Sequence, residues 1–303
     1  EIVSRDWSSD VCSSDLPPPP PRKAPFAKKS LGQNFLVDQQ AISRIVEAVP
    51  MGTPLLLEIG PGRGALSTAL FSRAKKFCVL EKDDLFAKNI GETLFVHGSR
   101  SHFIFHSDAL EFEWDRLWKE SESSVDTPLT ICANLPYNVA TEIFFRLMKI
   151  RERIPRMVLM FQKEVAQRIA AKPGTRNSGV LSIAAQNYYN VKIQQILKPG
   201  AFRPSPKVDS AVLEFQRLEK PVLEFPDQES FEQFLNLVRA CFAHRRKTVE
   251  NSLSMECSKI SWLKDVGKKN LQQALNELGI SGQRRAETIT IAEFGRIFEK
   301  LKQ

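Results

Sequence analysis

The chain has 303 residues, a formal net charge of +8, and 42% hydrophobic and 26% charged residues. This is the composition of an ordinary globular protein, and the length suits about two domains. No apolar run reaches the roughly 18 residues that cross a membrane, and the N-terminus lacks the apolar core of a signal peptide, so we expect a cytoplasmic protein without a membrane partner. The five cysteines lack CxxC or metal-ligand spacing, which predicts reduced thiols and no metal site.

The N-terminal segment lacks the pattern of a folded element. Its first residues are rich in Ser and Asp, and a run of five prolines follows at Pro17–Pro21, so we expect residues 1–22 to be a disordered or artefactual tail. Further on, Gly32-Gln-Asn-Phe-Leu36 suits either a loop folded over a ligand or the lead-in to a helix. Asp38 can cap that helix, whose apolar positions keep helical spacing from Ile42 onward.

A strand-to-helix junction rich in glycine comes next. Leu55–Ile59 is strongly apolar and predicts a strand, and Gly60-Pro-Gly-Arg-Gly64 leads from it into a helix expected over residues 65–72. Glycines at such a junction permit tight turns and a close approach of the backbone to a ligand. The pattern also fits G-x-G-x-x-A, a dinucleotide-binding variant, so alone it is compatible with NAD, a nucleoside or no ligand.

Acidic or amide side chains follow the next three predicted strands. Glu81 lies about 20 residues after the glycines, the spacing at which a carboxylate meets a ribose hydroxyl in nucleoside sites. Asp108 could read an adenine amine, and Asn134 follows the next strand. Open α/β sheets bind ligands at the carboxyl ends of their strands, so these residues and Gly60 predict one site. The three strands are expected over residues 77–80, 103–105 and 129–133.

The segment Asn134-Leu-Pro-Tyr137 is a candidate site for a planar base with an exocyclic amine. The side-chain oxygen of Asn134 and the carbonyl of Pro136 can accept the two amine protons, and the ring of Tyr137 offers a stacking face. Asn is neutral, so it orients the amine without removing a proton. The alternative is a strand that ends in an ordinary turn, because Asn and Pro are common turn residues.

The rest of the first part of the chain predicts three more strands and two helices. The segments at residues 191–197 and 208–215 could pair as a hairpin. Residues 151–217 carry 12 basic and 4 acidic side chains, a net charge of +8, which would draw a polyanion such as RNA or DNA. The helices are expected over residues 140–150 and 163–171, and the other strand over residues 157–161.

A stiff loop between the two last strands, residues 199–207, carries an aromatic ring and two cations. Phe202 is a candidate for stacking on a base, with Arg203 and Lys207 on phosphates. The alternative for Phe202 is that it anchors the proline-rich loop to the core.

From about residue 218 the pattern becomes helical. Apolar residues from Phe231 to Phe242 fall on one face, which predicts a small helical domain over residues 218–303 after a first domain over 23–217. Arg245, Arg246 and Lys247 lie between helices and are phosphate-contact candidates, although a solvated charge run is the usual explanation.

Six motifs in order resemble the ribosomal RNA adenine dimethyltransferase family of class I S-adenosylmethionine (SAM)-dependent enzymes, from about Lys28 to Phe294. The departures are an acidic, Ser-rich stretch at residues 120–126 and the tail, and neither touches a motif. The motifs are Gly32-Gln-Asn-Phe-Leu36, Leu57-Glu-Ile-Gly-Pro-Gly62, Asn134-Leu-Pro-Tyr137, Gln162-Lys-Glu-Val165, Pro206-Lys-Val-Asp-Ser-Ala-Val212, and Arg245-Arg-Lys-Thr248 with Asn251-Ser-Leu253.

The resemblance implies a Rossmann-like class I methyltransferase: an α/β fold with a seven-stranded sheet, helices on both faces and a small C-terminal all-helical domain. It also implies roles around the cofactor SAM. Asn34 and Leu36 would close over SAM, Gly60 would approach its methionine part, Glu81 would hold its ribose and Asp108 would read its adenine. Asn134 would lie between the cofactor and the target base.

The implied activity is methylation of the exocyclic N6 of two adjacent adenosines near the 3′ end of small-subunit rRNA during ribosome biogenesis. We expect a monomer whose partner is the assembling small subunit, with no protein partner. Four alternatives stay open: a DNA adenine methyltransferase, an NAD-dependent oxidoreductase, a relative that dimethylates large-subunit rRNA, and an assembly factor whose catalysis is secondary or lost.

Overall fold

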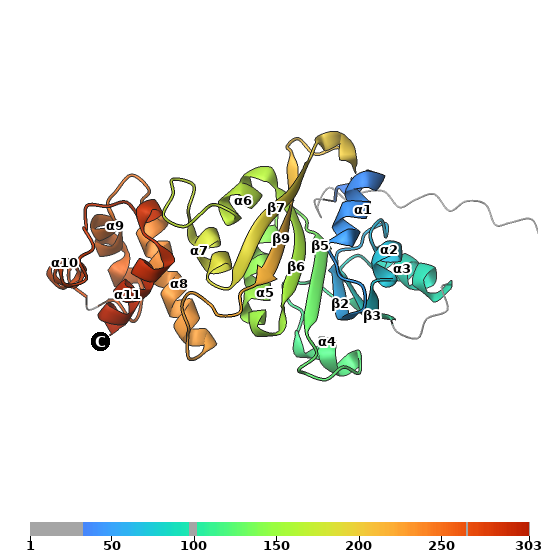
Figure 1. Ribbon diagram of the computed structural model, residues 1–303, viewed down its shortest axis with the longest axis horizontal. Helices are drawn as coiled ribbons and strands as arrows, with labels where there is room; N and C mark the ends of the chain where they lie inside the picture. The colour runs from blue at the N-terminus through green and yellow to red at the C-terminus, as the bar shows by residue number, and fades with distance from the viewer. Residues whose placement is uncertain (1–32, 97–101, 265, 303) are drawn as a thin grey trace, which may run out of the picture.

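The computed structural model describes residues 33–96, 102–264 and 266–302, so the predicted tail over residues 1–22 lies outside the described part. The molecule is elongated, with a twisted sheet towards one end and the last four helices at the other (Figure 1). None of the helices in the described ranges is long and apolar enough to cross a membrane.

The sheet has seven strands in the order β4-β3-β2-β5-β6-β9-β7. The first five are parallel, whereas β9 is antiparallel to both of its neighbours. All seven predicted strands are therefore confirmed, as is the antiparallel pairing of the last two. Their bounds are β2 Thr53–Ile59, β3 Ala74–Glu81, β4 His102–His106, β5 Leu129–Asn134, β6 Arg156–Gln162, β7 Tyr189–Leu197 and β9 Ser210–Arg217.

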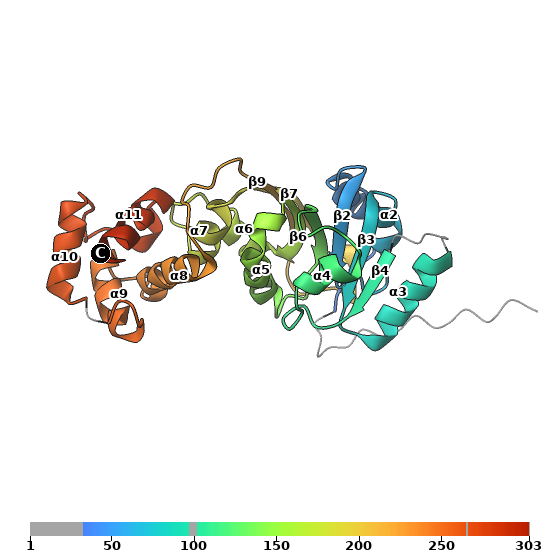
Figure 2. The ribbon, with the colours of Figure 1, turned by 90° about the horizontal axis from the view of Figure 1, so that it is seen from below.

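Both faces of the sheet are buried. Successive side chains of a strand point to opposite faces, so neighbouring residues of one strand join different hydrophobic clusters. Leu55 and Leu57 belong to one hydrophobic cluster with residues of α5, whereas Leu56 belongs to a second cluster with residues of α1. Helices cover the two faces (Figure 2), as predicted. Their bounds are α1 Gln39–Glu47, α2 Ser67–Phe71, α3 Asp84–Val96, α4 Asp115–Glu120, α5 Ala140–Lys149, α6 Lys163–Ile169 and α7 Val180–Gln186.

The segment before α1 is tied to the loop between β7 and β9. Asp38 accepts a hydrogen bond from the backbone N–H of Ala41 at 3.0 Å, which confirms the predicted cap. Just before it, β1 (Phe35–Leu36) pairs with β8 (Phe202–Arg203) in a separate two-stranded sheet. This pairing places the N-terminal motif beside residues that lie more than a hundred positions further along the chain.

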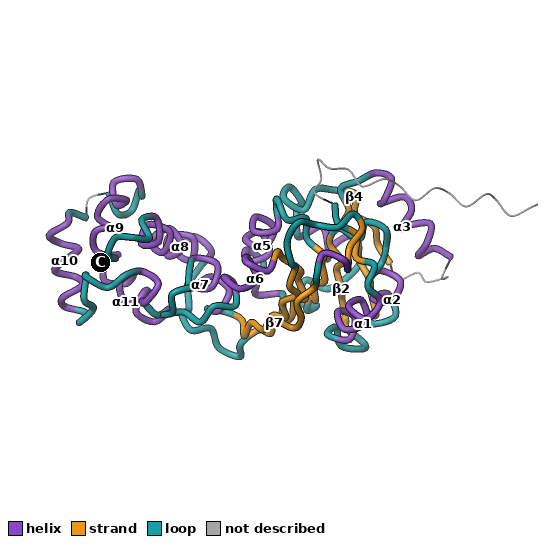
Figure 3. The backbone as a smooth tube through the Cα atoms, turned by 90° about the horizontal axis from the view of Figure 1, so that it is seen from above, coloured by secondary structure: helices purple, strands orange, loops and turns teal. Residues whose placement is uncertain are grey.

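Over the described residues 218–264 and 266–302, the C-terminal part contains helices and loops only (Figure 3). The predicted apolar face is buried along α8, from Phe231 to Cys241, and Gly279 follows α10 with φ +66°. These helices share one hydrophobic cluster with the sheet, so the division into residues 23–217 and 218–303 stays a prediction. The helices are α8 Gln228–Ala243, α9 Val249–Glu256, α10 Lys268–Glu277 and α11 Ile291–Lys302.

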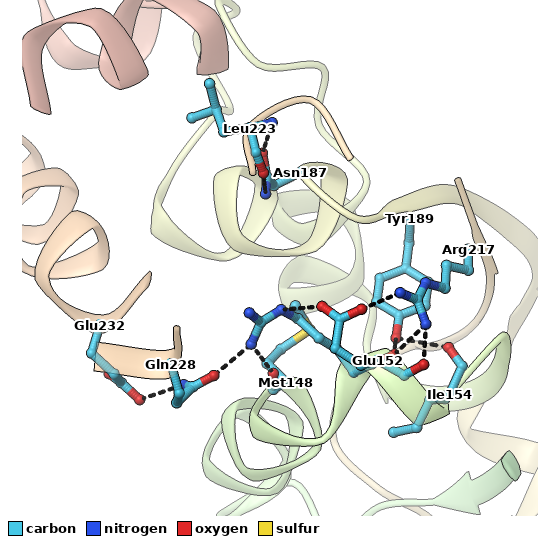
Figure 4. A network of polar contacts seen from close by, with 10 residues as sticks. Met148, Glu152, Ile154, Asn187, Tyr189, Arg217, Leu223, Gln228 and Glu232 are labelled. Atoms are coloured by element: carbon cyan, nitrogen blue, oxygen red, sulfur yellow. Dashed lines mark hydrogen bonds and ion pairs between the residues drawn. The ribbon is translucent and has the colours of Figure 1, made fainter. Parts of the chain in front are cut away.

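A buried arginine connects the sheet part to α8. Arg151, in a short 3-10 helix (Arg151–Arg153), donates to the carbonyl of Met148 at 3.0 Å and to Gln228 Oε1 at 2.5 Å. Its guanidinium lies 4.4 Å from the ring centroids of both Tyr188 and Phe231. Figure 4 shows the surrounding polar network, in which Gln228 comes from α8. One side chain thus holds elements of both parts of the molecule.

Candidate active site

A cavity of about 220 Å³ lies at the carboxyl ends of β2, β3 and β5. The structure brings together around it every residue that was predicted to bind the cofactor or orient the base. Open α/β sheets bind ligands at this edge because the chain turns away there and leaves a crevice. The predicted residues that line the cavity are Asn34, Leu36, Gly60, Glu81, Asp108, Asn134, Pro136 and Tyr137.

The glycine loop forms the backbone wall of the cavity. Gly60 and Gly62 have φ values of +66° and +55°, a left-handed conformation that side chains disfavour. A Cβ at Gly60 would have no neighbour within 4 Å, which leaves open space for a ligand, whereas a Cβ at Gly62 would lie 2.8 Å from the Phe35 ring. Gly62 is therefore required both by its backbone conformation and by the close approach of β1.

Replacing Gly62 with Ala should weaken binding of SAM, the cofactor that the sequence resemblance implies, roughly tenfold or more, because the strain and the contact with Phe35 displace the loop or β1. Gly91→Ala is the matched control: Gly91 is helical, its added Cβ meets nothing within 4 Å, and Ala stabilises helices by about 0.5–1 kcal/mol relative to Gly. Calorimetric titration with SAM checks both variants. Equal SAM affinity in the two would contradict this role for Gly62.

Glu81 ends β3 with its carboxylate held in place by backbone N–H groups. Its Oε2 accepts from Gly62 at 3.1 Å and its Oε1 from Asp83 at 2.8 Å. Burial raises the pKa of the Glu81 carboxyl, although these N–H groups oppose the shift by stabilising its charged form. The carboxylate is thus fixed beside the glycine loop, where a ribose hydroxyl could donate to it.

Asp108 lies further along the same edge of the sheet. Its Oδ1 accepts from the N–H of Leu110 at 2.9 Å, and its Oδ2 is 2.6 Å from Lys82 Nζ. Burial by itself would raise the pKa of Asp108, but Lys82 and the Leu110 N–H outweigh it, so the pKa lies below its usual value. The group is therefore an anionic acceptor at the cavity wall.

The amide of Asn134 is oriented by the N-terminal segment. Asn134 Nδ2 donates to the carbonyl of Asn34 at 3.0 Å, and because this bond uses the nitrogen, Oδ1 is left to act as an acceptor. The neighbouring carbonyl of Pro136 accepts from the Val139 N–H at 3.1 Å. A carbonyl oxygen has two lone pairs, so one remains for the predicted contact with an amine.

A residue that the sequence reading did not single out is Glu58, the acid in the motif Leu57-Glu-Ile-Gly. It lines the cavity and is only 2% exposed, and Ser67 Oγ donates to its Oε2 at 2.6 Å. Burial raises its pKa to about 8; the bond from Ser67 opposes the rise and the charge of Glu81 adds to it. The sequence signal that could have identified Glu58 is a carboxylate inside an otherwise apolar strand.

Glu58 predicts a specific pH dependence. Its pKa is higher in the folded than in the unfolded chain, so the folded state holds one more proton between the two values and stability falls as the pH rises from about 4.5 to about 8. Glu58→Gln, which resembles the protonated acid, should lack this slope, and at pH 9 its free energy of unfolding should exceed that of the wild type by on the order of 5 kcal/mol. Urea unfolding at pH 5 and pH 9 measures the free energy of unfolding, with the exposed Glu47→Gln as control. An equal change in this free energy between the two pH values for wild type and Glu58→Gln would refute the prediction.

The predicted RNA contacts lie outside the cavity lining. Arg203, Lys207 and the run Arg245–Lys247 are exposed, as phosphate contacts must be. Phe202 differs: its side chain is 0% exposed and belongs to the second hydrophobic cluster, with Leu36. In this structure Phe202 anchors the loop, the alternative raised from the sequence, because β1 covers it through its pairing with β8.

No group of three or more His, Cys, Asp or Glu residues within the described ranges is arranged to hold a metal ion.

A Rossmann-like sheet whose one antiparallel strand, β9, lies between β6 and the edge strand β7, with a cavity at the carboxyl ends of its parallel strands, is the arrangement of the class I methyltransferase fold. Two solved structures share this fold. A dimethyladenosine transferase from Plasmodium falciparum has a TM-score of 0.70 at 24% identity, with 87% of this chain and 95% of that chain covered. The 23S rRNA methyltransferase ErmE has a TM-score of 0.64 at 24% identity, with 89% and 100% covered.

The chain belongs to the ribosomal RNA adenine dimethylase family, whose sequence pattern matches residues 26–303. Relatives from Bacillus cereus (strain B4264) and Bacillus anthracis (strain CDC 684 / NRRL 3495), both called ribosomal RNA small subunit methyltransferase A, are 40% identical over 276 residues. These matches cover 90% of this chain and 91% of each relative. The resemblance predicted from the six motifs is confirmed, and with it the assignment as an rRNA adenine methyltransferase.

Proposed function

We propose that this enzyme transfers methyl groups from SAM to N6 of two adjacent adenosines near the 3′ end of small-subunit rRNA, giving dimethyladenosine. The observation that carries the proposal is the Asn134–Tyr137 segment, which borders the same cavity as the glycine loop and Glu81. The 40% identity to small-subunit methyltransferases supports the choice of substrate.

The residues around the cavity fit SAM. The open space beside Gly60 would admit the methionine part, the Glu81 carboxylate would accept from the ribose hydroxyls, and the anionic Asp108 would accept from the adenine amine. Asn34 and Leu36 would cover the cofactor from the N-terminal side. When bound, SAM supplies an electrophilic methyl group on a sulfonium, so the protein needs mainly to position the two reactants.

The target base must leave its stack to reach the cavity, as enzymes that modify bases require. Its exocyclic amine is a weak nucleophile because the nitrogen lone pair is delocalised into the ring. Hydrogen bonds from the two N–H groups to Asn134 Oδ1 and the Pro136 carbonyl would favour a pyramidal nitrogen with its lone pair aimed at the methyl group. The Tyr137 ring would hold the base plane, and the rate gain would come from orientation.

The exposed basic side chains would hold the RNA backbone. Replacing Arg245, Arg246 and Lys247 together with Ala should weaken rRNA binding by a similar factor for all sequences and reduce the slope of log K against log salt by about 2–3. A triple variant of the exposed residues Lys75, Lys88 and Lys119 removes the same charge elsewhere. Binding isotherms at several salt concentrations compare them, and equal slopes in the two variants would reject the run as a contact.

The substrate is tested with labelled SAM and small ribosomal subunits that lack dimethyladenosine, with large subunits and adenine-containing DNA in parallel. We expect transfer to small subunits only. Transfer to large subunits instead would show that the substrate is large-subunit rRNA. SAM binding without transfer to any substrate would favour a ribosome-assembly role.

A further inference from the structure

The Tyr137 hydroxyl has a partner that the mechanism above does not use. Its oxygen lies 2.5 Å from Ser210 Oγ. Tyr137 lies in the loop after β5, whereas Ser210 is the first residue of β9 and is 0% exposed. A polar group this deeply buried needs a hydrogen-bond partner, and Tyr137 is the partner of the Ser210 hydroxyl.

The bond links parts of the chain that are not neighbours in the sheet. Because β6 lies between β5 and β9, and neighbouring strands are about 4.8 Å apart, the backbones of β5 and β9 are roughly 10 Å apart. Tyr137 follows the end of β5 by three residues, so this bond joins the loop after β5 to β9, a strand that is not a neighbour of β5 in the sheet. A phenylalanine would keep the ring but would lose this attachment.

The Ser210 end of the bond is rigid. Ser210 is in register with Gln162 of β6 and Leu197 of β7, so strands on both sides fix its backbone. The preceding Asp209 accepts from the Lys163 N–H at 2.9 Å, and its carboxylate pairs with Lys163 at 3.2 Å and with Lys198 at 3.0 Å. The Tyr137 loop, in contrast, belongs to no strand or helix.

We propose that Ser210 is a positioning residue for the methyl transfer: it ties the Tyr137 hydroxyl to β9 and so fixes the plane of the ring on which the target adenine stacks. The hydroxyl of Tyr137 then serves as an attachment and takes no part in proton transfer. The attachment of Tyr137 to Ser210 rests on the geometry alone. Its effect on the rate of methyl transfer rests on the proposed function.

A double-mutant cycle tests the kinetic part. Ser210→Ala and Tyr137→Phe should each lower kcat about tenfold with little change in SAM affinity or in KM for the RNA. The double variant should also be about tenfold down, because the second change removes nothing more. Ser205→Ala is the control, since Ser205 is an exposed serine in the loop before β9 and its hydroxyl donates to the carbonyl of Pro199. A roughly hundredfold loss in the double variant, or full activity of Ser210→Ala, would overturn the proposal.

A second readout needs no activity. The chain has three tyrosines, so 3-fluorotyrosine labelling should give three fluorine NMR signals, and Tyr137→Phe identifies the one from Tyr137. Ser210→Ala should shift that signal alone, and Ser205→Ala should shift none. An unmoved Tyr137 signal would refute the attachment itself. A moved signal in an enzyme that methylates no RNA would instead place the failure in the proposed function.

Discussion

Asn134→Ala will lower the rate of methyl transfer by roughly a thousandfold. The variant loses the acceptor that orients the amine, and removal of one group aligned with a developing charge costs about 10²–10³ in turnover in enzymes that rely on such alignment. It also loses the bond to the Asn34 carbonyl, which should cost only about 1 kcal/mol of stability. Single-turnover transfer from labelled SAM measures the rate, and thermal unfolding measures the fold.

Asn276→Ala is the matched control, because Asn276 is an exposed residue of α10 and Ala is a better helix former than Asn. It should transfer methyl groups at the wild-type rate. Turnover of Asn134→Ala within a few-fold of that rate would remove Asn134 from the mechanism.

Arg151→Ala should lower the free energy of unfolding by about 4 kcal/mol. Two hydrogen bonds from a charged donor are lost, at about 1.5–3 kcal/mol each, together with the contacts to the Tyr188 and Phe231 rings, partly offset by relaxation around the vacated space. Gln228 on α8 would lose its bond to Arg151, so the C-terminal helices should loosen against the sheet. Urea unfolding together with limited proteolysis checks both effects.

Arg146→Ala, at an exposed position on α5, removes the same charge nearby and should change stability by less than about 0.5 kcal/mol. If the two variants unfold alike, Arg151 does not hold the two parts of the molecule together.

Much of the fold and the cavity follows from local sequence signals. Strands such as Leu55–Ile59 are nearly continuous apolar runs, as strands buried on both faces must be, and Gly60, Glu81, Asp108 and Asn134 each follow such a run. Because parallel strands place their carboxyl ends at one edge, their convergence could be predicted without coordinates. The cap at Asp38 was an equally local signal.

Features that depend on distant pairing were missed or misjudged. The strands β1 and β8 have two residues each, too few for a periodic pattern, so the burial of Phe202 beneath β1 could not be read from its loop. Helix α7 is apolar on nearly every side and lacks the 3.6-residue pattern of a surface helix. Ser210 carries no local sign of its bond to Tyr137, 73 positions away.

The most direct test of the central claim is mass analysis of nucleosides and of the 3′-terminal fragment from small subunits incubated with SAM and either wild type or Asn134→Ala. We predict two adjacent dimethyladenosines near the 3′ end with the wild type and unmodified adenosine with the variant. Methylation at another base or another position, or equal methylation by the variant, would contradict the claim that the Asn134–Tyr137 segment orients adenine N6 for transfer.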